Sequence, residues 1–243
     1  MDKICLVFDV DETILHYGPD DYFPQKFEYE EGIVSEKDRI VIRPGLQDFV
    51  NYVNLNRDRV SIGIWTYGTK EYADAVAKRI EDKYNDSEKL FQFVYSREDM
   101  SPGMLDKELD FVIRHNPELD RETTFLVDNR PANVYHRKNR GNGIVVESFE
   151  GKKTSAKDKM FDSLQKICNS LLVKGNVPKK YVKDFLVSGS ETPIVNIGET
   201  FDDGFTPIKT SKTTKKTISK TTSKSTGWKS SGKTRKQKNS STV

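Results

Sequence analysis

The chain has 243 residues, 35% of them hydrophobic, and a formal net charge of +3. This length allows one large domain or two small ones, and no apolar run approaches the length needed to cross a membrane. The near-neutral average hides two regions of opposite charge. Eleven Lys and Arg residues and no Asp or Glu follow Asp203, so the formal charge is about −8 up to that point and +11 after it.

The last part of the chain has the composition of a disordered tail. From about Thr206 it consists mainly of Lys, Ser and Thr, which cannot bury enough apolar surface to offset the entropy lost on ordering. We expect one folded domain over residues 1–190 and a disordered basic tail over residues 191–243. The tail could bind nucleic acid or another anionic partner, or carry a nuclear targeting signal around residues 233–238. A solubilising role is favoured, because no aromatic ladder or Arg cluster accompanies the lysines.

The cysteines and the N-terminus indicate a cellular compartment. Cys5 and Cys168 lie in apolar runs, which is typical of buried free thiols in a reducing compartment. The apolar run at residues 4–8 is too short for a signal peptide and is followed by acids. We therefore expect a soluble intracellular monomer without membrane contact, in the nucleus or the cytoplasm.

The first 150 residues alternate between strand-like apolar runs and apolar residues at helical spacing, and two helical segments follow them. The pattern predicts first a buried strand at residues 3–9, then a β-hairpin insertion within 17–42 and a helix after the turn at 43–45. Two strand–helix pairs come next, with strands at 60–66 and 91–96 and helices at 70–84 and 105–114. The last predicted elements are strands at 123–128 and 143–146 and helices at 155–173 and 178–187. This alternation indicates an α/β fold with a parallel sheet flanked by helices on both faces.

Polar residues end three of the predicted strands, at the edge where open α/β sheets bind ligands. The first strand is followed by DVDET, which contains Asp9, Asp11 and Thr13. Two neighbouring carboxylates repel each other unless a cation lies between them, and Mg²⁺ prefers oxygen ligands. Asp9 could then attack a phosphorus atom, and Asp11 could protonate the leaving group and later deprotonate water. The alternative is a plain acidic turn after a strand.

Two further strand ends supply matching groups. Thr66 ends the strand at residues 60–66, where its hydroxyl and the following backbone N–H groups would bind phosphate oxygens. Asp128 and Asn129 follow the strand at residues 123–128 and offer oxygen atoms to Mg²⁺. Thr66 could instead cap a helix, and an Asp-Asn pair by itself is usually a turn.

Phosphoryl transfer at such a site also needs a cation that holds the phosphate. We choose Lys107, at the start of its predicted helix. Three other cations compete for this role: Arg97, Lys70 and Arg114.

Five ordered segments resemble the FCP/SCP family, phosphatases of the haloacid dehalogenase (HAD) superfamily that act on the C-terminal domain of RNA polymerase II. The segments are DVDETILH, RPGLQDF, WTYGTKEYADAVA, the region of Lys107, and VDNRP, and the resemblance covers roughly residues 3–150. The spacing from Lys107 to Asp128 is longer than is usual in the family. No BRCT-like segment follows the core.

The resemblance implies a Rossmann-like core with a small β insertion after the first motif. It implies that Asp9 is the nucleophile, that Asp11 is the general acid and base, and that Thr66 and Lys107 hold the phosphate. Mg²⁺ would be bound by Asp9, by the main-chain carbonyl of Asp11 and by Asn129, with Asp128 nearby or linked through water. We place five residues of the matching segments on the substrate side: Thr13, Arg43, Tyr67, Gly68 and Arg130.

The sequence therefore predicts a Mg²⁺-dependent phosphoserine/phosphothreonine protein phosphatase. Its substrate would be a phosphorylated Ser/Thr-Pro-rich peptide such as the RNA polymerase II C-terminal domain. A second reading keeps the chemistry and changes the substrate to a small metabolite or a polynucleotide 3′-phosphate. The short, aromatic insertion favours an open groove for a peptide. A third reading is a scaffold without activity, which the intact acid pair disfavours.

Overall fold

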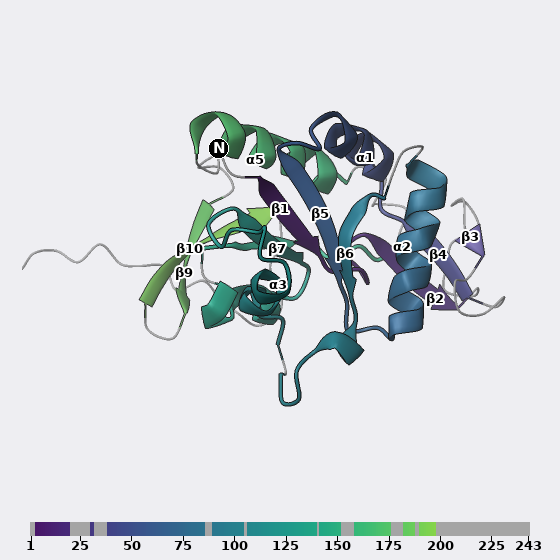
Figure 1. Ribbon diagram of the computed structural model, residues 1–243, viewed down its shortest axis with the longest axis horizontal. Coiled ribbons are helices and arrows are strands. Elements are labelled where there is room, and N and C mark those ends of the chain that lie inside the picture. The colour runs from purple at the N-terminus through teal and green to yellow at the C-terminus, as the bar shows by residue number, and fades with distance from the viewer. Residues whose placement is uncertain are drawn as a thin grey trace, which may run out of the picture. The chain divides into compact units, whose positions relative to one another are not determined.

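A largely parallel sheet forms the centre of the computed structural model (Figure 1). The structure describes residues 3–19, 30–31, 38–85, 89–104, 106–139, 141–151, 158–175, 182–187 and 190–197. Among these residues seven strands pair in the order β6-β5-β1-β7-β8-β10-β9. The strands are β1 (Ile4–Phe8), β5 (Val60–Trp65), β6 (Phe91–Tyr95), β7 (Thr124–Asp128), β8 (Gly143–Val146), β9 (Val182–Val187) and β10 (Ser190–Ile197). All neighbours run parallel except β9 and β10.

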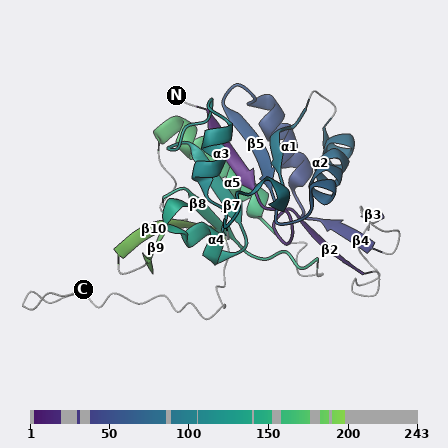
Figure 2. The same ribbon diagram turned by 60° about the horizontal axis from the view of Figure 1, so that its bottom comes forward.

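Helices cover both faces of the sheet, as predicted (Figures 1 and 2). The helices are α1 (Leu46–Leu55), α2 (Lys70–Tyr84), α3 (Leu109–His115), α4 (Pro131–Tyr135) and α5 (Met160–Lys174), with short 3-10 turns η2 (Arg97–Asp99) and η3 (Arg137–Asn139). Side chains of β1 alternate between the faces: Leu6 and Phe8 pack with α1, α2 and α5, whereas Cys5 and Val7 pack with α3.

Glycine is required at two positions by geometry. Gly45 begins α1 at a φ of 87°, a backbone conformation that a side chain disfavours. A Cβ atom at Gly63 in β5 would lie 2.3 Å from the Phe93 ring of β6. These two sites hold the first helix and the edge strand close to the core.

The insertion after the first motif is a small antiparallel sheet, which confirms the predicted β insertion. It contains β2 (Leu15–Pro19), β3 (Glu30–Glu31) and β4 (Asp38–Ile42) in the order β2-β4-β3. Tyr17 of β2 meets Tyr72 of α2 edge to face, with ring centroids 5.8 Å apart. The insertion is thereby joined to the helix that follows Thr66.

The end of the folded region differs from the prediction. Residues 182–187 form strand β9, so the helix predicted at 178–187 is wrong. The segment VKDFLV pairs with β10 instead, with Val187 opposite Ser190. β10 itself pairs with β8, placing Val195 opposite Ile144, so the sheet includes residues that we expected in the tail. The rest of the predicted tail, residues 198–243, lies outside the described residues.

The helices of the structure are expected not to cross a membrane. Within the described ranges, none of the helices combines the length and the apolar character needed to cross a membrane.

Candidate active site

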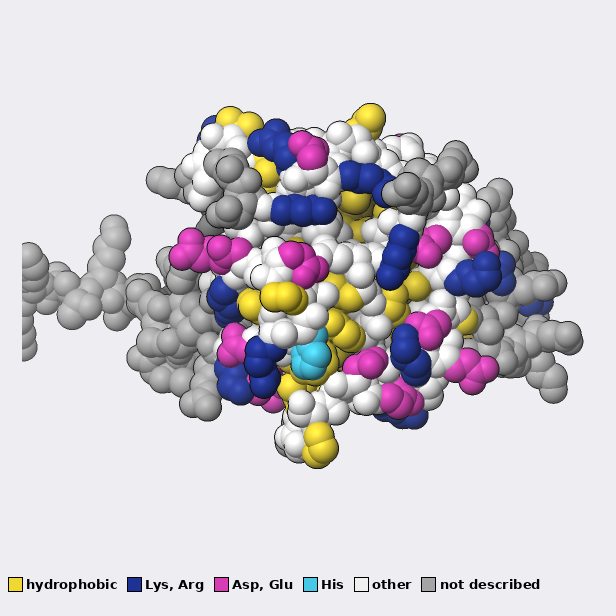
Figure 3. Space-filling view, viewed as in Figure 1, with side chains coloured by type: hydrophobic (Ala, Val, Ile, Leu, Met, Phe, Trp, Pro, Cys, Tyr) yellow, Lys and Arg dark blue, Asp and Glu magenta, His cyan; other side chains and the backbone are white. Residues whose placement is uncertain are grey.

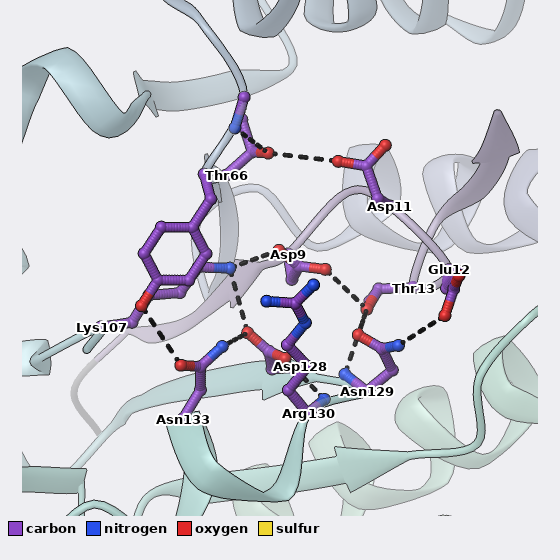
Figure 4. A network of polar contacts seen from close by, with 12 residues as sticks. Asp9, Asp11, Glu12, Thr13, Thr66, Lys107, Asp128, Asn129, Arg130 and Asn133 are labelled. Carbon is purple, nitrogen blue, oxygen red and sulfur yellow. Dashed lines mark hydrogen bonds and ion pairs between the residues drawn. The ribbon is translucent and has the colours of Figure 1, made fainter. Parts of the chain in front are cut away.

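The strand order brings the predicted site residues together. β1 lies between β5 and β7, with Phe8 in register with Ile64 and Val127. The polar residues that follow, one position on from Phe8 and Val127 and two positions on from Ile64, therefore meet at one edge of the sheet. They are Asp9, Thr66 and Asp128, and all three are buried. Figure 4 shows their side chains around a common centre.

Asp9 is a buried carboxylate whose two oxygens have different partners. Oδ1 contacts the Nζ of Lys107, and Oδ2 accepts a hydrogen bond from Thr13 Oγ1 at 3.1 Å. Burial, opposed by Lys107 but reinforced by Asp128 and Asp11, raises the pKa of Asp9 from 3.8 to about 7. The single ammonium does not compensate all of the negative charge around Asp9.

Lys107 is the predicted cation that the fold brings to Asp9. Its side chain is fully buried just before α3, and Nζ also lies 3.0 Å from Asp128 Oδ2. Burial lowers the pKa of Lys107, but Asp128 and Asp9 outweigh this effect and raise it above its usual value. The charge of the ammonium is therefore maintained.

The three competing cations lie elsewhere. Lys70 is half-exposed and pairs with Asp74, Arg97 is exposed beside Glu98, and Arg114 donates to the Asp110 carbonyl of its own helix. None of the three contacts Asp9 within the described part of the chain.

Asp128 is held by three N–H donors. Oδ2 accepts from Lys107 and from Asn133 Nδ2 at 2.9 Å, and Oδ1 accepts from the Arg130 N–H at 2.7 Å. With both oxygens engaged, Asp128 suits an indirect role beside a metal rather than direct ligation. Asn139 extends the network, because it donates to the Lys107 and Asn133 carbonyls and accepts from the Leu109 N–H.

Asn129 places a second oxygen beside Asp9. Its Oδ1 lies 3.3 Å from Thr13 Oγ1, the same hydroxyl that bonds Asp9 Oδ2. Within the described ranges, no three His, Cys, Asp or Glu side chains come together as a metal site. The donor set for Mg²⁺ is instead one carboxylate and one amide oxygen, with a main-chain carbonyl expected from Asp11. Hard oxygen ligands and the uncompensated charge at Asp9 fit this cation.

Asp11 lies on the exposed side of the site. Its Oδ1 accepts a 2.6 Å hydrogen bond from the Tyr72 hydroxyl, and its Oδ2 lies 3.5 Å from Thr66 Oγ1. Burial and Asp11 raise the pKa of Tyr72 well above its usual value, so Tyr72 acts as a hydrogen-bond donor. An exposed carboxylate between two hydroxyls can reach a bound substrate.

Thr66 does not cap the following helix. The N-cap of α2 is Thr69, whose hydroxyl accepts from the Tyr72 N–H at 3.2 Å. The Thr66 hydroxyl instead accepts from the Gly68 N–H at 3.0 Å. Gly68 is required by space, because a Cβ atom there would lie 2.4 Å from the Tyr72 ring.

Tyr67 covers Lys107. The Lys107 Nζ lies 5.3 Å from the centroid of the Tyr67 ring, a cation–π arrangement. The Tyr67 hydroxyl donates to Asn133 Oδ1 at 3.3 Å. Tyr67 is half-exposed and Arg130 is exposed, so both can meet a substrate.

Arg43 is a buried support beneath the site, where we predicted a substrate-binding residue. It is 2% exposed. Its NH1 donates to the Thr13 carbonyl at 3.0 Å, and its Nε and NH2 bind Asp158 Oδ2 at 2.9 and 2.7 Å. The Arg43 guanidinium is therefore engaged by the Thr13 carbonyl and by Asp158, and its predicted contact with substrate stays a prediction.

Several site residues were not predicted. Tyr72 has the spacing of an apolar helix face, which gave no signal for its hydroxyl. Asn133 and Asn139 follow the VDNRP segment, but asparagines near a turn are common. Asp158 precedes α5 and carries no motif.

Solved structures of Fcp1 are among those similar to this chain. A structure of Fcp1, an essential RNA polymerase II CTD phosphatase, matches with 23% identity and a TM-score of 0.45, over 72% of this chain and 55% of that one. The fission yeast RNA polymerase II CTD phosphatase Fcp1-R271A, bound to beryllium fluoride, matches with 24% identity and a TM-score of 0.45, over 70% and 50%.

An uncharacterized protein from Listeria monocytogenes serotype 4b matches with 14% identity and a TM-score of 0.35, over 52% and 67%. The chain spans about half the length of the two Fcp1 chains. No curated protein matches the sequence. The profile of the NLI interacting factor-like phosphatases matches residues 4–178, which is most of the chain and includes every strand end described above. The chain belongs to this family of HAD-type phosphatases.

Proposed function

We propose that the chain is a Mg²⁺-dependent phosphoserine/phosphothreonine protein phosphatase that forms an aspartyl-phosphate at Asp9. The observation that carries this proposal is the buried Asp9 carboxylate, with Lys107 on one oxygen and the Thr13–Asn129 pair beside the other. A carboxylate held in this way at a strand end is oriented as a nucleophile. Lys107 provides fixed positive charge where phosphate oxygens would lie.

The chemistry divides into two steps. An Asp9 oxygen attacks phosphorus while the bond to the ester oxygen breaks, and Asp11 gives a proton to that oxygen. Asp11 then takes a proton from water, whose oxygen attacks phosphorus and releases phosphate and the Asp9 carboxylate. Bound Mg²⁺ would neutralise phosphate charge. Asp9 and Asn129 supply side-chain oxygens for it.

The shape of the insertion supports a peptide substrate. The strands β2 and β4 form a small sheet beside the site, and Asp11 next to it is exposed. An exposed general acid can meet a chain segment, such as a phosphorylated Ser-Pro-rich tail resembling the RNA polymerase II C-terminal domain. On the face shown in Figure 3, basic and acidic side chains of the described residues are interspersed, which does not favour a polynucleotide there.

Hydrolysis of p-nitrophenyl phosphate with Mg²⁺ tests the chemistry. We expect Asp9→Asn to lose activity by at least about 10³-fold, because the nucleophile is removed. Asp74→Asn, an exposed acid paired with Lys70 on α2, is the matched control and should keep full activity. Equal turnover by wild type and Asp9→Asn would disprove the mechanism.

A substrate panel tests the specificity. Rates on a phosphoserine heptad peptide, a sugar phosphate and a 3′-phosphorylated oligonucleotide should rank the peptide first. A faster rate on either of the other two would show that the substrate is a small metabolite or a polynucleotide 3′-phosphate and not a peptide. Wild type that traps beryllium fluoride at Asp9 would exclude a scaffold without activity.

A further inference from the structure

The side-chain amide of Asn129 has its two ends in different surroundings. Its oxygen faces Thr13 Oγ1, next to Asp9. Its nitrogen lies 3.2 Å from Glu12 Oε2 and 2.9 Å from Ser148 Oγ. Figure 4 shows the amide between Thr13 and Glu12. The orientation of this amide decides which atom is presented beside Asp9.

Glu12 determines that orientation chemically. An ionised carboxylate only accepts hydrogen bonds, so the amide end that faces it must be the NH₂ group. If the amide were rotated by half a turn, its oxygen would face the carboxylate and its nitrogen would face Asp9. Nitrogen of an amide cannot serve as a ligand for a hard cation, whereas the oxygen can.

The backbone of Glu12 is itself held in an uncommon conformation. Its φ is 60°, in the left-handed region that residues other than glycine rarely occupy. The Glu12 N–H donates to the Leu15 carbonyl at 2.7 Å, and its carbonyl accepts from the Phe149 N–H at 2.7 Å. Such a conformation persists where the surrounding structure fixes it.

One loop, which follows β8, contacts both Glu12 and Asn129. Ser148 and Phe149 follow β8, in residues 147–151, and bind Asn129 and Glu12 respectively. The loops after β1, β7 and β8 are thereby joined by Glu12, Asn129 and Ser148. Among the described residues, the hydrogen bonds of the Glu12 and Ser148 side chains both go to the Asn129 amide nitrogen, so we expect any effect on the reaction to pass through Asn129.

We propose that Glu12 and Ser148 are positioning residues that fix the Asn129 amide with its oxygen toward Asp9, and so set the affinity of the site for Mg²⁺. This inference rests on the proposed function and extends it to two residues outside the predicted site. Partners of metal ligands commonly change affinity by about 10–100-fold when they are removed.

The test measures the dissociation constant of Mg²⁺ alone by calorimetry, on the full chain without substrate. Ser148→Ala removes one acceptor without changing charge, and we expect it to weaken Mg²⁺ binding about 10-fold. Ser148→Thr keeps the hydroxyl and should restore binding. Ser163→Ala, on α5 and outside the three loops, is the matched control and should bind as wild type does.

Two substitutions of Glu12 separate orientation from charge. Glu12→Asn suits the left-handed backbone but is one methylene shorter and has no carboxylate, so we expect a loss of more than about 10-fold. Glu12→Gln keeps the reach and one accepting oxygen and should lose less. The melting temperature without Mg²⁺ should stay close to that of wild type in all variants, because the proposed role is positioning.

The outcomes distinguish the two proposals. Wild type that binds no Mg²⁺ would overturn the proposed function and this inference together. If wild type binds Mg²⁺, and Ser148→Ala and Glu12→Asn bind it equally well, the inference alone is wrong. If Ser148→Ala or Glu12→Asn lowers the metal-free melting temperature, the more conservative substitution at the same position, Ser148→Thr or Glu12→Gln, is used for the comparison of Mg²⁺ affinity. The Asn129 NH₂ signal in a ¹⁵N spectrum is compared as well. An unmoved signal in Glu12→Gln would also contradict the inference.

Discussion

The two sides of Asp9 differ in how their polar groups are held. On the Lys107 side, the side chains of Lys107, Asp128, Asn133 and Asn139 are all buried. Asp128 accepts from the Lys107 and Asn133 side chains, and Asn139 donates to the Lys107 and Asn133 main-chain carbonyls. On the Asp11 side, the carboxylate is exposed and meets only hydroxyls, from Tyr72 and Thr66, among the described residues. A fixed charge requires the first arrangement, and a group that exchanges protons with substrate and water benefits from the second. The contrast predicts that changes on the Lys107 side affect stability and activity together.

Lys107→Met should produce the largest effect. It leaves Asp9 and Asp128 buried without their shared cation, which costs about 3–5 kcal/mol in the free energy of unfolding. Activity should also fall by about 10²–10³-fold through loss of phosphate stabilisation. Urea unfolding and kcat measure the two losses. Lys70→Met, at an exposed ion pair on α2, is the control and should change stability by less than about 1 kcal/mol. A small loss in Lys107→Met would remove the distinction between the two sides.

The second prediction concerns pH in the absence of metal. The pKa of Asp9 is raised from 3.8 to about 7 in the folded protein, so the folded state binds the proton more tightly than the unfolded chain. Its contribution to stability is present at low pH and is lost as pH rises through about 7. In EDTA, wild type should lose roughly 2 kcal/mol between about pH 5.5 and 8.5 relative to Asp9→Asn. Parallel pH profiles of the two proteins would contradict the assignment.

Asn133→Ala should have an intermediate effect. It removes a donor to Asp128 and an acceptor from Tyr67, and we expect a loss of about 1–3 kcal/mol in the free energy of unfolding. Asn51→Ala, at an exposed hydrogen bond on α1, should change it by less than about 0.5 kcal/mol. Thermal unfolding of both variants makes the comparison. Equal losses of unfolding free energy in the two variants would mean that burial of the hydrogen bonds of Asn133 adds nothing to stability.

Tyr72→Phe should have the smallest effect on stability. It removes the hydroxyl that holds Asp11, so we expect kcat to fall several-fold, within about 10-fold, while the free energy of unfolding changes by about 1 kcal/mol or less. Tyr52→Phe removes a hydroxyl bound to Asn169 on α5 and should leave kcat unchanged. A fall in stability as large as that of Asn133→Ala would show that the Asp11 side is equally structural.

Strand ends were predictable from the sequence because two rules act together. An apolar run identifies each parallel strand, and parallel strands end at one edge of the sheet. Asp9, Thr66 and Asp128 follow from these rules, and Lys107 was chosen because phosphoryl transfer needs a cation that holds the phosphate. Tyr72 and Asn133 could not be predicted, because their roles depend on the direction in which a helix presents a side chain. The buried position of Arg43 could not be predicted either, because its partner Asp158 is 115 residues away in the chain. The strand β9 was missed because its run is short and gives no period that separates strand from helix.

The pairing of Arg43 with Asp158 sets a minimum length for any working fragment of this protein. The five sequence segments quoted above end before residue 150, yet the partner of the guanidinium lies just before α5. Phe161 of that helix packs on Phe49, with ring centroids 5.2 Å apart. A fragment cut at residue 150 would keep a buried cation without its carboxylate and expose the aromatic face of α1. Expression for crystallography should therefore retain α5, at least through Lys174.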